Sequence, residues 1–387
     1  MRYHPRKIEP LLRKAAGHFP GVLITGPRRA GKTTLLQHLF PKADYVLLEA
    51  ADVVARVRAD PRSFLAELKP PVILDEIQNV PELFTYLRAA MDTDGSRKGQ
   101  WLLTGSQEPQ LMHGVTESMA GRVAVFSLWP LSAEEAPEMN LITGGFPEVL
   151  AAPSVADIWF GSYVQTYLER DVRAVTNIGD LSTFRRFMSL LASRNGQMLN
   201  KTDIAAPLGI SVPTITRWLS ILEITGQIML VPPFYENFGK RLVKTSKLYF
   251  VDSGLALHLV GVRDWQSLAS SPFLGPMFEG LVAAEIVKHR LNRGLGRSLY
   301  YFRDKQGLEL DFIVDLGNRK LALIEVKATR TPMPTDTKPL ERLSSAVKDY
   351  KTRNYVACLE SSELRDFAVL APGVSAVPWN KIAALSA

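Results

Sequence analysis

Cysteine and long apolar runs are the two features that this chain lacks most. Its 387 residues include one cysteine, Cys358, within the apolar run 355–359. A single cysteine excludes an internal disulfide and any metal site built from several thiolates. The apolar run around Cys358 predicts that it lies in the core. No apolar run approaches the roughly 20 residues of a membrane-spanning helix. The basic residues 1–7 are not followed by the apolar segment of a secretory signal. We therefore expect a cytoplasmic protein without a membrane partner.

Acidic residues are the minority among the charged ones. The chain has 46 Lys and Arg against 39 Asp and Glu, a formal net charge of +7. Much of the excess lies in residues 184–247, where nine basic residues stand against three acidic ones. Such an excess is typical of a surface that meets a phosphate backbone, but a solvated basic face without a ligand has the same composition. The length of the chain predicts two or three domains.

A phosphate-binding loop begins at Gly26. The pattern Gly-x4-Gly-Lys-Thr follows a strand-like apolar run and precedes a helix-like stretch. In such a loop, backbone N–H groups surround the β-phosphate at a helix N-terminus. Lys32 would reach the β- and γ-phosphates, and Thr33 would hold Mg²⁺ through its hydroxyl. The predicted nucleotide-binding residues are Gly26, Pro27, Arg28, Arg29, Ala30, Gly31, Lys32, Thr33 and Thr34. The chain is therefore expected to bind a nucleoside triphosphate with Mg²⁺.

A second motif predicts the carboxylates of this nucleotide site. Strand-like and helix-like patterns alternate after the loop, which indicates a parallel sheet covered by helices. The apolar run 72–74 ends in Asp75 and Glu76. A buried strand there would deliver Asp75 to the Mg²⁺ shell, which is the Walker B role. Glu76 would then polarise the attacking water as a general base.

Further positions are candidates for sensing or neutralising the γ-phosphate. The next strand-like run ends in Thr104-Gly-Ser106, and Thr104 or Ser106 would be the polar sensor at the strand end. Arg122 precedes another strand-like run and is the candidate arginine finger. It would act in its own subunit or in a neighbouring subunit of a homo-oligomer. Arg28 and Arg29 in the loop are the alternatives for neutralising charge.

Five motifs in order carry a family resemblance. They are the phosphate-binding loop, Leu74-Asp-Glu-Ile-Gln78, Leu103-Thr-Gly-Ser106, Ala120-Gly-Arg122 and Gly144-Gly-Phe-Pro147. Over essentially its whole length the chain resembles the prokaryotic AAA-type ATPases with a C-terminal domain of unknown function, the AAA_14 plus DUF4143 arrangement. The resemblance implies an α/β fold with an AAA-type P-loop sheet, binding of ATP with Mg²⁺, and ATP hydrolysis as the enzymatic activity.

The middle of the chain predicts a helical connector and a winged helix-turn-helix. A short helical stretch from Asn200 ends at Gly209, and Ser211 is placed to cap a second helix with its own apolar stripe. A basic wing would lie between two strand-like runs that follow. The residues predicted to face DNA are Thr214, Arg217, Lys240 and Arg241. Winged helices also serve as packing and dimerisation modules, so the pattern leaves DNA binding open.

The C-terminal part indicates a different chemistry. Asp311 is followed 14 residues later by Glu325-Val-Lys327, each in its own strand-like run, and this resembles the PD-(D/E)xK nuclease superfamily. Glu325 and Lys327 would project from one strand face because they are two residues apart. Asp311 and Glu325 would share Mg²⁺ or Mn²⁺ with Glu279 from a helix, and Glu309 is the second choice as a ligand. The metal would generate hydroxide, with Lys327 positioning the water or neutralising the oxyanion. Members of this superfamily can also keep the fold without cutting.

The patterns divide the chain into three parts. Residues 1–150 are the AAA-type P-loop ATPase domain, 151–255 the connector and winged helix-turn-helix, and 256–387 a nuclease-like α/β domain. One hypothesis joins them as an ATP-driven DNA-processing enzyme. The other is a nucleotide-switched assembly protein whose C-terminal domain is a non-cutting scaffold. The four nuclease-like positions favour the first hypothesis, since a scaffold has no chemical need for them.

Overall fold

The chain folds into two compact units, each with its own sheet. The computed structural model describes residues 3–93, 97–105, 119–168, 181–234, 245–361 and 366–386. The first unit comprises Met1–Leu131 with two short pieces, Ile224–Gly226 and Leu291–Gly294. The second unit comprises Ser132–Glu223, Gln227–Arg290 and Leu295–Ala387. Within the described ranges, no helix combines the length and the apolar character that crossing a membrane requires.

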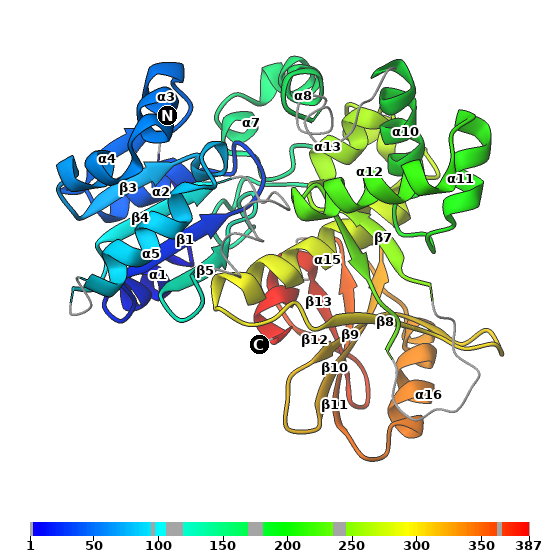
Figure 1. The fold of residues 1–387 in the computed structure, drawn as a ribbon. Coiled ribbons are helices and arrows are strands. Elements are labelled where there is room, and N and C mark those ends of the chain that lie inside the picture. Colours follow the sequence, from blue (N-terminus) through cyan, green and yellow to red (C-terminus); the bar gives the residue numbers. More distant parts are fainter. Residues whose placement is uncertain are drawn as a thin grey trace. The chain divides into compact units, whose positions relative to one another are not determined.

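The first unit is built on a parallel sheet with the strand order β2-β3-β4-β1-β5 (Figure 1). Its strands are β1 (Gly21–Thr25), β2 (Asp44–Leu47), β3 (Val72–Asp75), β4 (Trp101–Gly105) and β5 (Val123–Ser127). Strands β1, β3 and β4 are buried along their whole length, as expected for central strands with helices on both faces. The predicted α/β fold with a parallel sheet is confirmed. Because the strands are parallel, the carboxyl ends of β1, β3 and β4 lie at one edge of the sheet.

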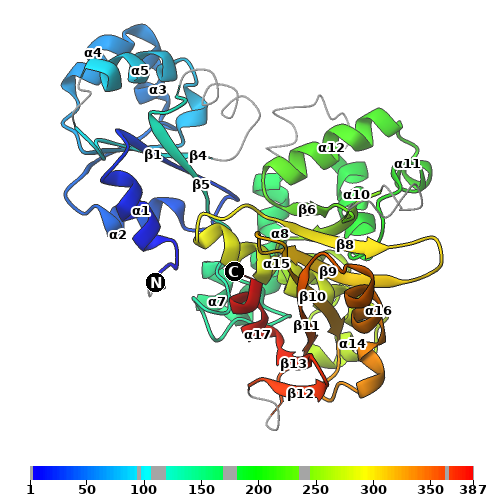
Figure 2. The same ribbon diagram turned by 90° about the horizontal axis from the view of Figure 1, so that it is seen from below.

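Helices cover both faces of this sheet (Figure 2). They are α1 (Glu9–Ala16), α2 (Lys32–Leu39), α3 (Ala51–Ala59), α4 (Pro61–Glu67), the 3₁₀ turn η1 (Ile77–Asn79) and α5 (Leu83–Thr93). Val22 and Ile24 of β1 pack in one apolar cluster with residues of α1 and α2. Leu23 points to the other face and packs with residues of α3, α4 and α5. This alternation is the period of a strand, and the two layers hold the carboxyl end of β1 in place.

The second unit begins with a helical region. Its elements are α7 (Pro147–Ala151), η2 (Pro153–Val155), α8 (Ala156–Tyr163), the π-helical η3 (Val164–Leu168), α10 (Leu181–Ser193), α11 (Lys201–Leu208) and α12 (Val212–Ile224). The Ser211 hydroxyl accepts a hydrogen bond from the Thr214 N–H at 3.3 Å and so caps α12, as predicted. Ile215, Leu219 and Leu222 form the expected buried stripe of α12, whereas Val212 at its start is 38% exposed.

An antiparallel strand pair follows α12 along the chain. It consists of β6 (Ile228–Val231) and β7 (Lys247–Phe250), in which Lys247 pairs with Val231. Two helices with a tight turn followed by such a pair are compatible with a winged helix, and that assignment stays a prediction. Lys240 and Arg241, the predicted wing residues, lie outside the described residues.

The second unit also contains a mixed sheet with the order β12-β13-β11-β10-β9-β8. Its strands are β8 (Leu299–Arg303), β9 (Glu309–Asp315), β10 (Lys320–Lys327), β11 (Lys351–Cys358), β12 (Ala368–Ala371) and β13 (Val374–Pro378). The helices in this part are α13 (Ser253–Leu259), α14 (Trp265–Ala269), α15 (Leu274–Asn292), η4 (Pro334–Thr337), α16 (Lys338–Ala346), α17 (Trp379–Ile382) and η5 (Ala383–Ser386). Cys358 is fully buried at the end of β11, as predicted, and burial raises the pKa of its thiol to about 11.

Candidate nucleotide site and acidic cluster

The predicted phosphate-binding loop joins β1 to α2. Gly26 has a φ of 143°, and a Cβ added to it would lie 2.0 Å from the backbone oxygen of Leu128, so a side chain has no room there. The Lys32 side chain is buried, and its Nζ donates to the carbonyls of Gly26 at 3.0 Å and Pro27 at 2.9 Å. Its ammonium therefore lies within the loop, at the N-terminus of α2, where phosphate oxygens are bound in such loops. Of the other loop residues, Ala30 is buried, Gly31 and Thr33 are half-buried, and Arg29 and Thr34 are exposed.

Three hydroxyl groups converge on Asp75 at the end of β3. Oδ2 accepts from Thr33 Oγ1 at 2.9 Å and from Tyr45 Oη at 2.8 Å, and Oδ1 accepts from Thr104 Oγ1. Burial, and then the hydrogen bond to Asp75, raise the pKa of Tyr45, so its hydroxyl stays a donor. A threonine hydroxyl and a carboxylate are oxygen ligands that suit Mg²⁺. Thr33 and Asp75 therefore fit a site for the magnesium ion of a nucleotide.

Glu76 is held beside the loop in a strained backbone conformation. Its φ of 59° and ψ of 45° are left-handed, a region that non-glycine residues seldom occupy outside functional sites and turns. Its carboxylate lies 3.8 Å from the guanidinium of Arg28 and accepts a hydrogen bond from Gln78 Nε2. The Glu76 N–H points to Thr104 Oγ1 at 3.4 Å. Glu76, Arg28 and Thr104 thus lie together at the carboxyl edge of the sheet.

Arg122 lies at the opposite edge. Its carbonyl accepts from the N–H of Gly21, at the amino end of β1, and its guanidinium holds Asp92 through bonds of 2.6 and 3.0 Å. The other end of β1, at Thr25, is about 13 Å away at the usual rise of a strand, and the loop starts beyond it. A finger role for Arg122 toward the nucleotide of its own chain does not fit this position. Ser106, the alternative sensor, lies outside the described residues.

Two residues of the nucleotide site were missed by the sequence analysis. Arg6 is buried and donates to the carbonyls of Ala30 at 2.9 Å and Trp129 at 2.7 Å, so it supports the loop from behind. Nothing in its neighbourhood separates it from other basic residues near the N-terminus. Tyr45 lies in β2, whose sequence predicts a strand. An aromatic residue with a hydroxyl group in that strand is the only sequence signal that Tyr45 gives.

The second unit brings together the predicted nuclease-like residues. Ile324 of β10 pairs with Phe312 of β9, so Asp311 lies next to the end of β10, where its Oδ2 accepts from the Val326 N–H at 2.8 Å. Lys327 Nζ is 2.7 Å from Glu325 Oε1. The other oxygen, Glu325 Oε2, is buried and has no hydrogen-bond partner among the described residues. We call Glu279, Glu309, Asp311 and Glu325, together with Lys247 and Lys327, the acidic cluster.

Lys247, which the sequence analysis counted with the basic segment, lies inside the acidic cluster. Its Nζ is 3.1 Å from Glu279, 2.9 Å from Glu309 and 3.9 Å from Asp311, and its side chain is 5% exposed. The Tyr249 hydroxyl also donates to Glu279. Lys247 therefore adds nothing to a basic surface. The signal for this was its place in a strand, two residues before Tyr249 and so on the same face.

Burial and mutual repulsion govern the ionisation of the acidic cluster. Desolvation first, and the charge of Asp311 second, raise the pKa of Glu279 to about 7 and that of Glu325 to about 8. Burial likewise raises the pKa of Asp311. Burial opposes the charged form of Lys247, but the surrounding carboxylates outweigh it and raise its pKa. At neutral pH the lysine is charged and the carboxyl groups share protons.

The acidic cluster does not fit a metal ion in this arrangement. In the part of the chain that the structure describes, no three Asp, Glu, His or Cys side chains are placed to hold a metal together. Glu279, Asp311 and Glu325, the predicted ligands, lie near one another, but the ammonium of Lys247 takes the position of the cation.

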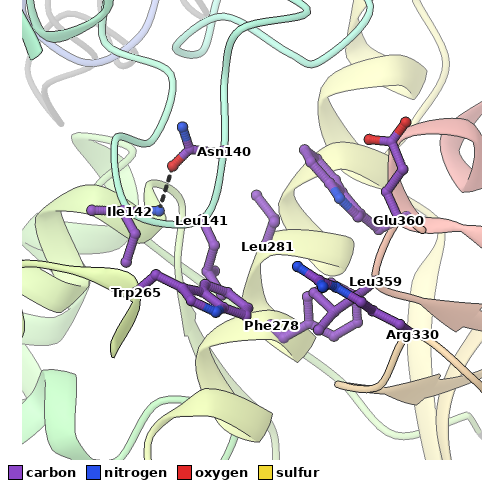
Figure 3. Close-up of a pocket in the computed structure, with 10 residues that line it drawn as sticks. Asn140, Leu141, Ile142, Trp265, Phe278, Leu281, Arg330, Leu359 and Glu360 are labelled. Atoms are coloured by element: carbon purple, nitrogen blue, oxygen red, sulfur yellow. Dashed lines mark hydrogen bonds between the residues drawn. The ribbon is translucent and has the colours of Figure 1, made fainter. Parts of the chain in front are cut away.

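A pocket of about 390 Å³ lies elsewhere in the second unit (Figure 3). Trp265, Phe278 and Trp379 supply its aromatic walls, and the guanidinium of Arg330 reaches into it. None of the residues predicted from the sequence to bind or react lines this pocket. Phe278 precedes Glu279 on α15, so the pocket and the acidic cluster share one helix.

Comparison with protein families covers nearly the whole chain. Residues 18–136 match the AAA domain family AAA_14, residues 134–266 match a domain of unknown function, DUF8612, and residues 274–381 match another, DUF4143. Two uncharacterized proteins, Rv2008c of Mycobacterium tuberculosis and Mb2031c of Mycobacterium bovis, are each 34% identical over 328 residues. The match spans 83% of this chain and 73% of each relative. The likeness thus extends over both units.

Solved structures give more distant likenesses. A Walker-type ATPase of Pyrococcus abyssi is 17% identical and aligns over 65% of this chain and 94% of its own, with a TM-score of 0.40. The RuvB Holliday junction branch migration motor of Thermotoga maritima is 15% identical over 58% of this chain and 89% of its own, with a TM-score of 0.32.

Proposed function

This chain belongs to the family of AAA-type P-loop ATPases that carry a C-terminal DUF4143 domain, and from that premise we propose that it binds ATP with Mg²⁺ and hydrolyses it. One observation carries the proposal, namely the convergence of Thr33 and Thr104 on Asp75 beside the buried ammonium of Lys32. This set supplies a cation for the phosphates and oxygen ligands for the metal at the carboxyl edge of a parallel sheet.

Each residue of the nucleotide site has a role in this proposal. Lys32 would bind phosphate oxygens, and Thr33 and Asp75 would hold Mg²⁺, which when bound neutralises charge on those oxygens. Glu76 would accept the proton of the attacking water at its carboxylate. Arg28, at 3.8 Å from Glu76, and Arg29 in the same loop would neutralise charge at this edge of the sheet.

Removal of the loop ammonium tests this proposal. We expect Lys32→Ala to lower ATP turnover by about 100-fold or more, because phosphoryl transfer depends on charge stabilisation at the phosphates. The measurement is release of inorganic phosphate from ATP with Mg²⁺. Lys14→Ala, at an exposed position of α1 in the same unit, is the matched control and should keep the parent rate. A Lys32→Ala protein that turns over ATP like the parent contradicts the proposal.

The proposed output of the ATPase is action on DNA through α12. Arg217 is exposed on this helix, as a recognition helix requires, and Thr214 near its capped start is half-buried. Helix α12 lies within the basic segment of the chain, which supports contact with a phosphate backbone.

The second candidate is the nucleotide-switched assembly protein with a non-cutting scaffold. The specific observation in its favour is Lys247, whose ammonium stands among Glu279, Glu309 and Asp311 in place of a metal. Metal-dependent cleavage of a phosphodiester needs these oxygens for the ion. In the arrangement seen here, the acidic cluster is therefore better suited to a structural role than to cutting.

A further inference from the structure

The environment of Lys247 is that of a bound cation. Its Nζ is 3.1 Å from Glu279 Oε1 and 2.9 Å from Glu309 Oε1, and Asp311 Oδ1 follows at 3.9 Å. The ring of Tyr301 faces the same ammonium, with its centroid 5.5 Å away. With only 5% of the side chain exposed, the ammonium has exchanged its water shell for protein oxygens and a ring, as a buried ion must.

The positive charges do not balance the carboxylates of the acidic cluster. Among the residues that the structure describes, three cationic groups lie within 4 Å of them, namely Lys247, Lys327 and the half-exposed Arg303. They face four carboxylates, those of Glu279, Glu309, Asp311 and Glu325. The carboxyl groups share protons at neutral pH, but a bound cation favours their ionised forms, and when all four are ionised one negative charge is in excess. Without Lys247 the excess would be two, the charge of one divalent ion.

One carboxylate oxygen of the acidic cluster, Glu325 Oε2, is also available to a cation. Glu325 Oε1 accepts from Lys327, but Oε2 is buried and unpaired within the described residues. A buried carboxylate oxygen without a donor is costly. Together with Asp311 Oδ1, 3.9 Å from the ammonium, it offers hard oxygen donors of the kind that Mg²⁺ and Mn²⁺ prefer.

We propose that Lys247 determines whether the acidic cluster takes a divalent metal ion, because its ammonium and the metal compete for the same carboxylates. This role of Lys247 concerns the acidic cluster of the second unit and does not depend on ATP hydrolysis. Lys247 is the first residue of β7, and it pairs with Val231 of β6.

Manganese binding by the full chain tests this inference directly. The test variant is Lys247→Met, whose unbranched side chain is one atom shorter and carries no charge, and bound Mn²⁺ is counted by electron paramagnetic resonance without nucleotide. The variant should bind one more Mn²⁺ than the parent, with an affinity for that site at least about tenfold higher. The additional site should disappear in the double variant Lys247→Met, Asp311→Asn. Lys247→Arg, which keeps the charge, should bind no more than the parent.

The matched control separates a specific site from a general effect of charge. Lys327→Met removes the half-buried ammonium that pairs with Glu325 but leaves Lys247 in place, and it should raise Mn²⁺ affinity much less. The inference is overturned if the two methionine variants gain equally, or if the parent already binds the additional ion in a way that Asp311→Asn abolishes.

Loss of Lys247 leaves carboxylates unpaired and can weaken the fold, so a second readout is needed. Ion binding to the folded state alone raises the unfolding midpoint. Mn²⁺ should therefore raise the unfolding temperature of Lys247→Met but not that of the parent. A variant that unfolds at the same temperature with and without Mn²⁺ contradicts the inference, whatever its stability. Neither readout involves ATP turnover, so failure here is distinct from failure of the ATPase proposal.

Discussion

Among single residues, Glu76 combines an unusual backbone with a carboxylate that is held in place. Its backbone is left-handed, with a φ of 59°, and Arg28 and Gln78 hold its carboxylate. A carboxylate that serves as general base contributes about 100-fold or more to a rate. We therefore expect Glu76→Gln to lower ATP hydrolysis by about that factor, because an amide cannot accept the proton of water. Single-turnover hydrolysis and titration with fluorescent ATP together give the rate and the affinity.

The affinity for ATP distinguishes a catalytic role of Glu76 from a structural one. Since Lys32 and Thr33 remain, the variant should bind ATP within about twofold of the parent. Glu82→Gln, a change at an exposed carboxylate of the same unit that pairs with Arg58, is the control and should change neither value. Equal losses of binding and hydrolysis in Glu76→Gln would assign Glu76 to holding the loop instead.

At the scale of helices and strands, the sequence predicted which elements form. It predicted less well at which end of the sheet the residues that flank a strand lie. Apolar runs predicted β1, β3 and β10, and the motif spacing put Lys32 and Asp75 at their ends because strand-to-helix turns are local. The position of Arg122 follows from direction: a residue before a parallel strand lies at the amino edge, opposite the loop. Contacts such as that of Arg6 with Trp129, 123 residues away, leave no local pattern.

The acidic cluster shows the same limit within one sheet. Strand alternation predicted that Glu325 and Lys327 share a face, and they do, with Nζ and Oε1 2.7 Å apart. Lys247 belongs to a different strand pair, and only the packing of that pair against β9 and α15 brings it to Glu279. Composition counted its charge toward a basic surface because composition does not register burial. The charge pattern of the sequence therefore did not reveal that Lys247 is buried among carboxylates.

The turn at Gly144 shows why one of the family motifs is needed. Gly144 has a φ of 64°, and a Cβ there would lie 2.2 Å from Asp252 Oδ1. Asp252 is buried, accepts from the Gly145 N–H at 2.7 Å and caps α13 through the Leu255 N–H at 3.0 Å. Phe146 then packs against Trp159 and Tyr163, with ring centroids 4.9 and 5.1 Å away. The Asp252 carboxylate therefore connects the turn that precedes α7 to the start of α13.

Gly144→Ala should destabilise the second unit. The left-handed backbone costs an alanine about 1 kcal/mol, and displacing Asp252 adds about 1–3 kcal/mol. Urea unfolding of the full chain, followed by tryptophan fluorescence, measures the loss. Gly261→Ala is the matched control, since Gly261 has a φ of 79° but open space around its added Cβ. It should show only the backbone cost, and equal losses in the two variants would refute the role given to Asp252.

For the molecule as a whole, the two proposed functions differ in what ATP and DNA change. A basic segment that contacts DNA gives affinity that falls steeply between about 50 and 200 mM salt, because bound counterions are released. We expect duplex DNA at low salt to raise ATP turnover, and Arg217→Ala to reduce this stimulation, since Arg217 is exposed on α12. Light scattering with and without ATP, with Lys32→Ala as the control, gives the mass of the assembly in the same preparation. If ATP changes that mass in the parent while DNA leaves turnover unaltered at every salt concentration, the chain is an assembly switch and its basic segment is a solvated face.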